Sequence, residues 1–285
     1  MPYTHYIYTP RSTSDIKTFR LRIDTEDPLF RGKKKLKLTG RELSDIPKVI
    51  FQLHELEILD LSPERQSCLN FKLLAVPPGI CRLTNLTVLI LDTNELTELP
   101  EEICQLVDLE SMALSNNLLD HLPKGFDNLQ KLRSLHMANN LFEVFPKELC
   151  QLENLEFLDM SDNKLTVLPV SISNMKNLHT LLLFLNNLSK LPDSLCEMTE
   201  LYCLWIGNNN ISRLPQNFGN LKNLDWNERY TSSVLDGNPL TYPPLEICRQ
   251  GVRAIDRFLR TSNLNGGQKL VDDTTWEKTE EDEAD

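Results

Sequence analysis

The sequence predicts an α/β solenoid, in which short parallel strands build a concave sheet and a helix closes the C-terminal end. The main observation is a pattern, L-x-x-L-x-L-x-x-N-x-L-x-x-L-P-x-x-I-x-x-L-x-x, that returns every 23 residues. Six consecutive units follow it, and they begin at Leu86, Leu109, Leu132, Leu155, Leu178 and Leu201. Asn stands at the ninth place of each unit, at Asn94, Asn117, Asn140, Asn163, Asn186 and Asn209. Pro stands at the fifteenth place, at Pro100, Pro123, Pro146, Pro169, Pro192 and Pro215. Such a period is typical of architectures whose units stack side by side.

Each recurring position has a physical role in such a fold. The L-x-L pair points inward from a short strand, because alternate side chains lie on the same face. The Asn side chain satisfies backbone groups where the chain leaves the strand. Pro fixes φ on the convex side, where the sheet requires no N–H donor. A lone unit cannot bury its apolar face, so the stack needs a cap at each end.

The N-terminal part departs from the pattern. Residues 1–32 lack the repeat and are expected to form an extension or cap, in which "FRLRI" (19–23) is a candidate capping strand. A first unit begins near Lys33, with Arg41 in place of the ninth-position Asn. The next unit is thirty residues long, and the surplus near 62–72 predicts a loop that leaves the strand end.

The C-terminal part closes the stack. An insertion of about six residues near 226–234 interrupts the last unit. The repeats are thus expected to fill residues 33–244 in about nine units, with the six regular ones at 86–223. Apolar residues at mostly helical spacing predict a capping helix within 245–260. Residues 261–285 are polar and end in an acidic run, which is typical of a disordered tail.

Composition favours a cytoplasmic protein that binds neither nucleic acid nor membranes. The net charge of −11 argues against nucleic-acid binding, which needs a basic face. The N-terminus lacks the apolar segment of a secretory signal, and no apolar run approaches the ~20 residues of a transmembrane segment. The seven cysteines form no CxxC pair or Cys/His cluster, so we expect reduced thiols and a cytoplasmic location.

The repeats resemble those of the intracellular leucine-rich repeat proteins of the Ras-related group, which include the Ras-suppressor proteins, the Ras–Raf scaffold repeat proteins and the Scribble/Erbin repeat domains. The resemblance rests on the 23-residue unit with its "LP" pair, on "LTELPEEICQL" (96–106) and on the ending "LDGNPLTYPPLEICRQGVRAIDRFL" (235–259). It implies a leucine-rich repeat horseshoe with a parallel concave sheet. It also implies a protein-binding scaffold, often in small-GTPase or kinase signalling.

In this geometry the third, fifth, seventh and eighth places of each unit face the concave side or its rim. Apolar residues gather at these places in three consecutive units, beside a polar His–Asp pair. Such a patch on an open face predicts a partner-binding surface. The candidate residues are Phe157, Asp159, His136, Leu182, Phe184, Leu185, Tyr202 and Trp205. Trp226 joins the third places if the interrupted unit keeps its register. The alternative is that a terminal segment of the same chain covers these side chains.

The run "LLLFL" (181–185) contains both kinds of position. Leu181 and Leu183 belong to the repeat core, so they are expected to be buried in the stack. Leu182, Phe184 and Leu185 are not required by the fold. The run is therefore interpreted as one core strand with an apolar outer face.

The same face also carries side chains of the types used in catalysis and metal binding. His136 and Asp159 hold the same place on adjacent strands and can hydrogen-bond, and Ser111 or Ser134 nearby suggests a hydrolytic triad. A smooth strand face has no pocket with an oxyanion site, which favours a polar binding pair. Metal ligation by His136, Asp159 and Cys203 lacks a known ligand spacing. We therefore expect no enzyme activity, no cofactor and no metal.

One short match suggests a further partner. "KVIF" (48–51) resembles the K/R-V-x-F peptide that docks on protein phosphatases, but Ile50 occupies a core place and is expected to be buried. The sequence as a whole predicts a monomeric, non-catalytic adaptor or scaffold whose partner is a protein, such as a small GTPase, a kinase or a phosphatase. The alternatives are a structural organiser of cytoskeletal or junctional assemblies and a phosphatase-regulatory subunit.

Overall fold

The structure is a computed structural model that describes residues 5–6, 21–25, 27–30, 32–38, 46–63, 72–226 and 234–264. The expectations for Arg41, for most of both insertions and for most of the N-terminal extension concern residues outside these ranges. The same holds for the acidic tail from residue 265 onward.

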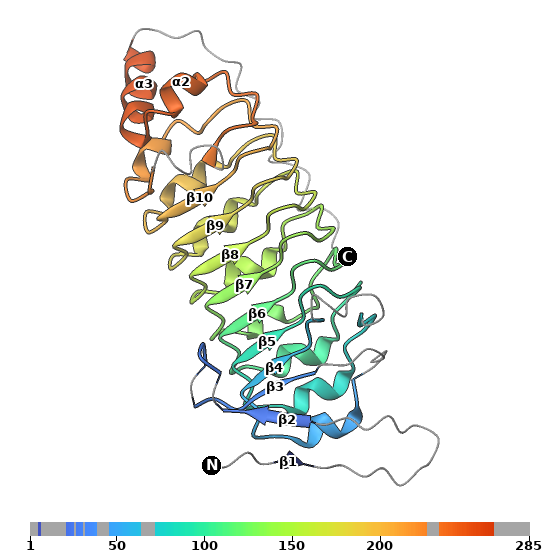
Figure 1. Cartoon of the computed structure of the whole chain (residues 1–285). Helices are drawn as coiled ribbons and strands as arrows, with labels where there is room; N and C mark the ends of the chain where they lie inside the picture. Colours follow the sequence, from blue (N-terminus) through green and yellow to red (C-terminus); the bar gives the residue numbers. More distant parts are fainter. Residues whose placement is uncertain are drawn as a thin grey trace, which may run out of the picture.

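The described strands form one sheet whose order follows the sequence from β1 to β10 (Figure 1). Eight of them are parallel and belong to successive repeats: β3 (Lys35–Lys37), β4 (Ile58–Asp60), β5 (Val88–Ile90), β6 (Ser111–Ala113), β7 (Ser134–His136), β8 (Phe157–Asp159), β9 (Thr180–Leu182) and β10 (Cys203–Trp205). The register is constant, so Leu181 is paired with Leu158 on one side and with Leu204 on the other. The predicted α/β solenoid with a parallel sheet is confirmed.

Two antiparallel strands lie at the N-terminal end of this stack. β2 (Leu21–Asp24) pairs with β3, and β1 (His5–Tyr6) pairs with β2. β2 overlaps the segment 19–23 in which the sequence suggests a capping strand. Because β2 occupies the edge of β3, the backbone groups that a preceding repeat would use are already paired.

Short 3-10 helices form the opposite side of the solenoid, behind the sheet in Figure 1. They are η1 (Lys48–Gln52), η2 (Pro78–Arg82), η3 (Glu101–Gln105), η4 (Phe126–Asn128), η5 (Lys147–Gln151), η6 (Val170–Asn174), η7 (Asp193–Glu197) and η8 (Phe218–Asn220). Proline directly precedes most of them, and Pro100 before η3 has φ −68°. The proline ring fixes this φ and provides no N–H, so it turns the chain without removing a hydrogen bond from the sheet.

A buried asparagine at the ninth place joins each repeat to its neighbours. The Asn117 amide donates to the carbonyl of Leu114 at 2.9 Å and to that of Leu91, one unit earlier, at 3.0 Å. Its Oδ1 accepts the N–H of Leu96 at 3.2 Å. The same three contacts recur at Asn94, Asn140, Asn163, Asn186, Asn209 and Asn238. The predicted role of this Asn is confirmed.

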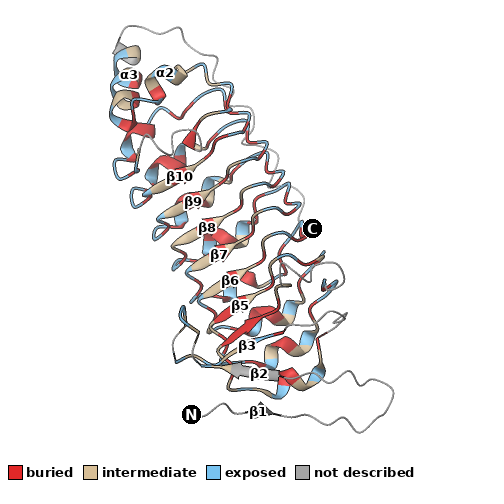
Figure 2. Ribbon diagram, in the orientation of Figure 1, coloured by how far each residue is buried: buried red, intermediate tan, exposed pale blue. Residues whose placement is uncertain are grey.

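The core lies between the sheet and the 3-10 helices, where leucines of successive units stack (Figure 2). Leu181 and Leu183 are fully buried, as the interpretation of "LLLFL" predicts. Leu182 and Phe184 are half-buried, and Leu185 is exposed. The run therefore divides between the core and the open face of the sheet.

The interrupted unit regains the repeat register after its insertion. Ile206 donates its N–H to the carbonyl of Val234 at 2.9 Å, as Leu183 does to Trp205 one unit earlier at 2.7 Å. Val234 therefore occupies the fifth place of its unit. This position confirms an insertion of about six residues.

Trp226 does not join the third places on the concave side, because the condition that its unit keeps the register there is not met. Its ring lies edge-on to Phe218, a fully buried core residue, with a centroid distance of 6.4 Å. Gly251 approaches so closely that a Cβ there would lie 3.3 Å from the Trp226 ring. The insertion begins directly after Trp226, so this residue leaves the strand register and packs beneath the C-terminal helices.

Two helices, α2 (Leu245–Cys248) and α3 (Val252–Leu264), cover the C-terminal end. The side chain of Gln216 donates to the carbonyl of Leu259 in α3 at 3.0 Å. α3 continues past Arg260, where the sequence suggests that the tail begins. Within this added turn the Thr261 hydroxyl donates to the carbonyls of Arg257 at 2.9 Å and Phe258 at 3.1 Å. No helix among the described residues is long and apolar enough to cross a bilayer.

Two neighbouring leucines test the division of the "LLLFL" run. Leu183→Ala is expected to lower the free energy of unfolding by about 2–5 kcal/mol, because it empties a fully buried site. Leu182→Ala is the matched control on the open face and is expected to cost about 1 kcal/mol or less. Urea unfolding followed by circular dichroism measures both losses. Equal losses would contradict the placement of Leu182 outside the core.

Candidate functional site

The open face of the sheet becomes apolar towards its C-terminal end. Register pairs Leu182 on β9 with Trp205 on β10, and Phe184 and Leu185 follow β9 after the core residue Leu183. We call these four side chains, Leu182, Phe184, Leu185 and Trp205, the concave patch. Leu185 is 44% exposed and the other three are half-buried. The structure therefore brings together four of the residues that the sequence proposes as a binding surface.

Leu185 adopts a backbone conformation that is unfavourable for its side chain. Its φ is +57°, in the left-handed region. The eighth places of the other regular units share this conformation, and they carry Thr93, Asn116, Asn139, Asp162 and Asn208. Asn and Asp tolerate this region because their short polar side chains hydrogen-bond locally, whereas Leu does not. Leu185 is thus an exposed apolar residue at a strained position, and strain of this kind often marks functional sites.

Trp205 differs from the rest of the patch because part of its ring belongs to the core. It is half-buried and packs against the core cluster. A rigid aromatic ring that is fixed on one side and accessible on the other is a suitable anchor for a partner. Substitution of Trp205 would therefore affect folding as well as any binding.

His136, Phe157 and Asp159 lie beside the patch on β7 and β8. The rings of His136 and Phe157 are tilted against each other with centroids 4.6 Å apart. His136 Nε2 lies 3.0 Å from the hydroxyl of Ser134, and Asp159 Oδ1 accepts the N–H of Ser161 at 2.9 Å. His136 and Asp159 are in register, but they use these separate partners.

The suggested catalytic and metal constellations are not assembled in this geometry. Ser134 and His136 belong to one strand. The Asp159 carboxylate accepts the N–H of Ser161 just after its own strand, whereas the His136 ring contacts Ser134. Cys203 starts β10, two strands beyond Asp159. In the ranges that the structure describes, no three His, Cys, Asp or Glu side chains are placed to hold a metal ion.

Tyr202 lies beside the concave patch and not within it, so its part in partner binding stays a prediction. It precedes β10 at the second place of its unit, and it is 57% exposed. Asp225 beside it raises the pKa of its hydroxyl, because the carboxylate charge disfavours a phenolate. Second- and third-place side chains point to different sides of a strand, so Tyr202 lies on the edge where the strands begin.

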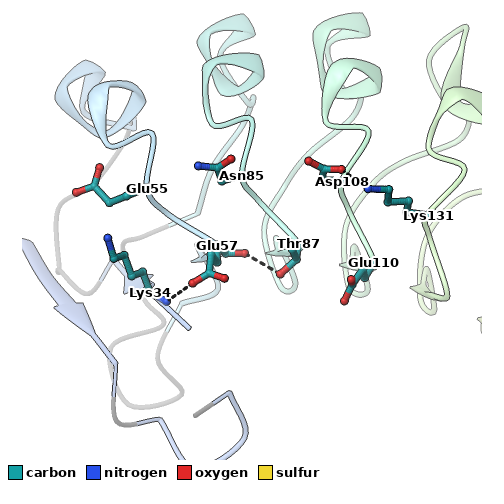
Figure 3. Close-up of a pocket in the computed structure, with 8 residues that line it drawn as sticks. All are labelled: Lys34, Glu55, Glu57, Asn85, Thr87, Asp108, Glu110 and Lys131. Carbon is teal, nitrogen blue, oxygen red and sulfur yellow. Dashed lines mark hydrogen bonds and ion pairs between the residues drawn. The ribbon is translucent and has the colours of Figure 1, made fainter. Parts of the chain in front are cut away.

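A polar depression of about 470 Å³ lies along this same edge in the first repeats (Figure 3). It is lined by Lys34, Glu55, Glu57, Asn85, Thr87, Asp108, Glu110 and Lys131. Its charges largely pair within the wall or with neighbouring side chains: Lys131 lies 2.6 Å from Asp108, and Lys33 lies 3.8 Å from Glu110. Such ion pairs at an exposed edge contribute little to stability.

The chain covers the N-terminal end of its own open face. Ile58 and Asp60 on β4 are buried, and so is Val88 on β5, whereas the equivalent side chains of β6 to β10 are half-buried (Figure 2). Lys37 Nζ lies 3.2 Å from Asp60, and Lys35 Nζ lies 2.7 Å from Asp27. Burial at β4 does not extend to the concave patch, whose side chains are half-buried to exposed.

A second group of apolar side chains, which sequence reasoning missed, lies on the outer side of the solenoid. Val144 is 67% exposed, and Val170 at the start of η6 is 73% exposed. Val167, at the same place as Val144 one unit later, is also exposed. The sequence signal is an apolar residue at the thirteenth or sixteenth place, where other units carry mostly polar residues.

The "KVIF" segment does not form an accessible strand. Residues 48–51 lie in η1, and Ile50 and Phe51 are buried. The expectation that Ile50 is buried is confirmed. A peptide that docks by strand addition must be extended and exposed, so the phosphatase-docking reading of this segment is wrong.

The cysteines of the described ranges are free thiols: Cys81, Cys104, Cys150, Cys196, Cys203 and Cys248. Burial raises the pKa of Cys104 to about 11 and that of Cys196 and Cys248 to about 12. Thiols with raised pKa values are poor nucleophiles and act as small apolar side chains.

Comparisons with known proteins agree with this geometry. A family model for a leucine-rich repeat region matches residues 143–233, and a leucine rich repeat model matches residues 84–142. A search of curated proteins finds no match. Among solved structures, a leucine-rich repeat protein of Leptospira interrogans is 30% identical with a TM-score of 0.56, and the alignment covers 75% of this chain and 63% of that one.

Two plant receptors are also similar. The peptide hormone receptor RGFR1, solved in complex with RGF2, is 25% identical with a TM-score of 0.57, over 73% of this chain and 31% of that one. The second is the ectodomain of the receptor kinase GASSHO1/SCHENGEN3 from Arabidopsis thaliana, solved in complex with CASPARIAN STRIP INTEGRITY FACTOR 2. It is 24% identical with a TM-score of 0.57, and the alignment covers 82% of this chain and 34% of that one. This second likeness shows the fold alone. The chain spans less than two thirds of the length of each of these three structures.

The strained position of Leu185 leads to an unusual stability prediction. Leu185→Asn is expected to raise the free energy of unfolding by about 1 kcal/mol, because Asn tolerates the left-handed region. The reverse exchange, Asn139→Leu at the same place two units earlier, is expected to lower it by a similar amount. Thermal and urea unfolding measure both variants. A loss of stability in Leu185→Asn would show that packing, and not backbone strain, dominates at this place.

Proposed function

Because the chain is a leucine-rich repeat protein, we propose that it is a non-catalytic adaptor or scaffold that holds a protein partner on the concave patch. The observation that carries this proposal is Leu185, an exposed apolar side chain kept at φ +57° where equivalent units carry Thr, Asn or Asp. Burial of Leu185, Phe184 and Leu182 by a partner would remove apolar surface from water. The similar receptor RGFR1 is described in complex with RGF2, which supports polypeptide binding by this fold.

We further propose that this adaptor is cytoplasmic, acts as a monomer and serves intracellular signalling. Its free cysteines fit a reducing compartment. The resemblance of its repeats to the Ras-related group favours a small GTPase or a kinase as the partner. A signalling adaptor of this type would prefer one nucleotide state of a GTPase, whereas a structural organiser would not.

A matched pair of variants tests the proposed surface. Phe184→Asp places a charge in the concave patch and is expected to reduce recovery of the main partner from a cell extract at least ~10-fold. Val170→Asp makes the same change at an exposed apolar residue on the outer side and is expected to leave recovery unchanged. Quantitative affinity capture with the intact chain measures both, and unfolding curves verify that both variants fold. Loss of the partner only in Val170→Asp would contradict the proposal and show that the partner binds on the outer side.

A further inference from the structure

The open face of the six regular units carries acidic side chains but no Lys or Arg. Its third, fifth, seventh and eighth places contain three carboxylates, which are Asp92, Asp159 and Asp162. No Lys or Arg within the described ranges forms an ion pair with any of the three. Elsewhere on the solenoid, acids are commonly paired across units, as Arg133 is with Glu156. The acids of the open face thus remain available to a cation from outside the chain.

Two of these carboxylates border the concave patch. Asp159 is the register partner of Leu182 on the adjacent strand. Asp162 occupies the eighth place one unit before Leu185, and its N–H donates to the carbonyl of Phe184 at 2.7 Å. The patch therefore has an acidic border on its N-terminal side. On its other side lie the uncharged Gly207 and Asn208.

The third carboxylate, Asp92, lies further along the same face. It accepts the N–H of Ser115 at 2.7 Å. Burial raises the pKa of Asp92, because desolvation disfavours its charged form. A cation bound at this part of the face would stabilise the carboxylate and offset part of that cost.

From this arrangement we infer that the partner presents a polypeptide segment in which an apolar side chain stands next to a Lys or Arg. The apolar side chain contacts the concave patch, and the cation lies between Asp159 and Asp162. This inference rests on the proposed function and names the chemistry of its partner. Nucleic acid and anionic lipid do not fit, because their phosphates would face carboxylates.

Charge complementarity at the border of an apolar contact has specific consequences. The apolar contact supplies the larger share of the affinity, since the acidic border is partly exposed and is screened by salt. The cation selects among apolar segments and speeds their association. A segment with an acidic residue beside its apolar anchor is rejected by like-charge repulsion.

Random peptides displayed on phage are the probe for this inference. The intact chain is used as bait, with Phe184→Asp and Val170→Asp as parallel baits. We expect selected peptides to bind the parent and Val170→Asp, to be lost on Phe184→Asp, and to be enriched in Lys or Arg next to an aromatic or aliphatic residue. A chosen peptide is then synthesised, and its affinity is measured with its basic residue and with Gln in that place.

The double variant Asp159→Asn, Asp162→Asn isolates the acidic border. Asn retains the oxygen that accepts the Ser161 N–H, so the strand end keeps its local hydrogen bond. We expect the peptide to bind this variant roughly 10-fold more weakly at low salt, and the Lys-to-Gln peptide to bind parent and variant equally. The loss is expected to shrink at high salt.

The outcomes separate the two proposals. Peptides that require Phe184 but lack basic residues, or that bind the Asn double variant as tightly as the parent, would overturn this inference and leave the proposed function in place. Peptides that do not distinguish Phe184→Asp from the parent would overturn both.

Discussion

The buried ninth-position asparagine is the interaction on which the rest of the structure depends. A strand of three residues can bury little apolar surface alone, and the chain must reverse directly after it. Each Asn satisfies one carbonyl in its own unit, one carbonyl in the preceding unit and one N–H where the preceding unit turns outward. Buried backbone groups left unpaired would each cost about 1–3 kcal/mol. The ladder thus fixes the turn, the register and the spacing of the units together.

This arrangement separates folding from function within one strand. The Asn ladder, the leucines behind the sheet and the prolines that precede most of the 3-10 helices together specify the solenoid. The side chains on the open face are left free to vary, and across the regular units they change from Asp92 through His136 to Leu182 and Trp205. Apart from Trp205, which also packs against the core, an apolar side chain in the concave patch has no folding reason. At Leu185 it even opposes the backbone preference of its position. The concave patch is therefore best explained by something outside the chain.

The parts of the structure that follow from the period could be predicted from the sequence. The parallel sheet, the Asn contacts and the division of "LLLFL" all depend on spacing, which a single sequence displays. Trp226 could not be placed, because an insertion directly after it allowed its ring to pack on Phe218. The continuation of α3 past Arg260 could not be predicted, because the polar residues there carry no helical apolar spacing. Tyr202 is close to the patch residues in the sequence, but the alternation of side chains along a strand places it on a different side from the third-place residue Cys203. The contact between Asp27 and Lys35 could not be predicted, because Asp27 lies before the first repeat.

The central claim is that the fold does not require Leu182, Phe184 and Leu185, the three side chains of the concave patch outside the core cluster. It is tested most directly by replacing the fifth-, seventh- and eighth-place side chains of the unit that begins at Leu178 with those of the unit that begins at Leu132. This is the triple change Leu182→His, Phe184→Ala and Leu185→Asn. The free energy of unfolding of this variant, measured in urea, is the deciding quantity. The account predicts a value within about 1 kcal/mol of the parent, because the changes remove only face side chains and relieve the strain at Leu185. A loss of about 3 kcal/mol or more, as for a buried-core truncation, would show that the patch is part of the core and would contradict the account.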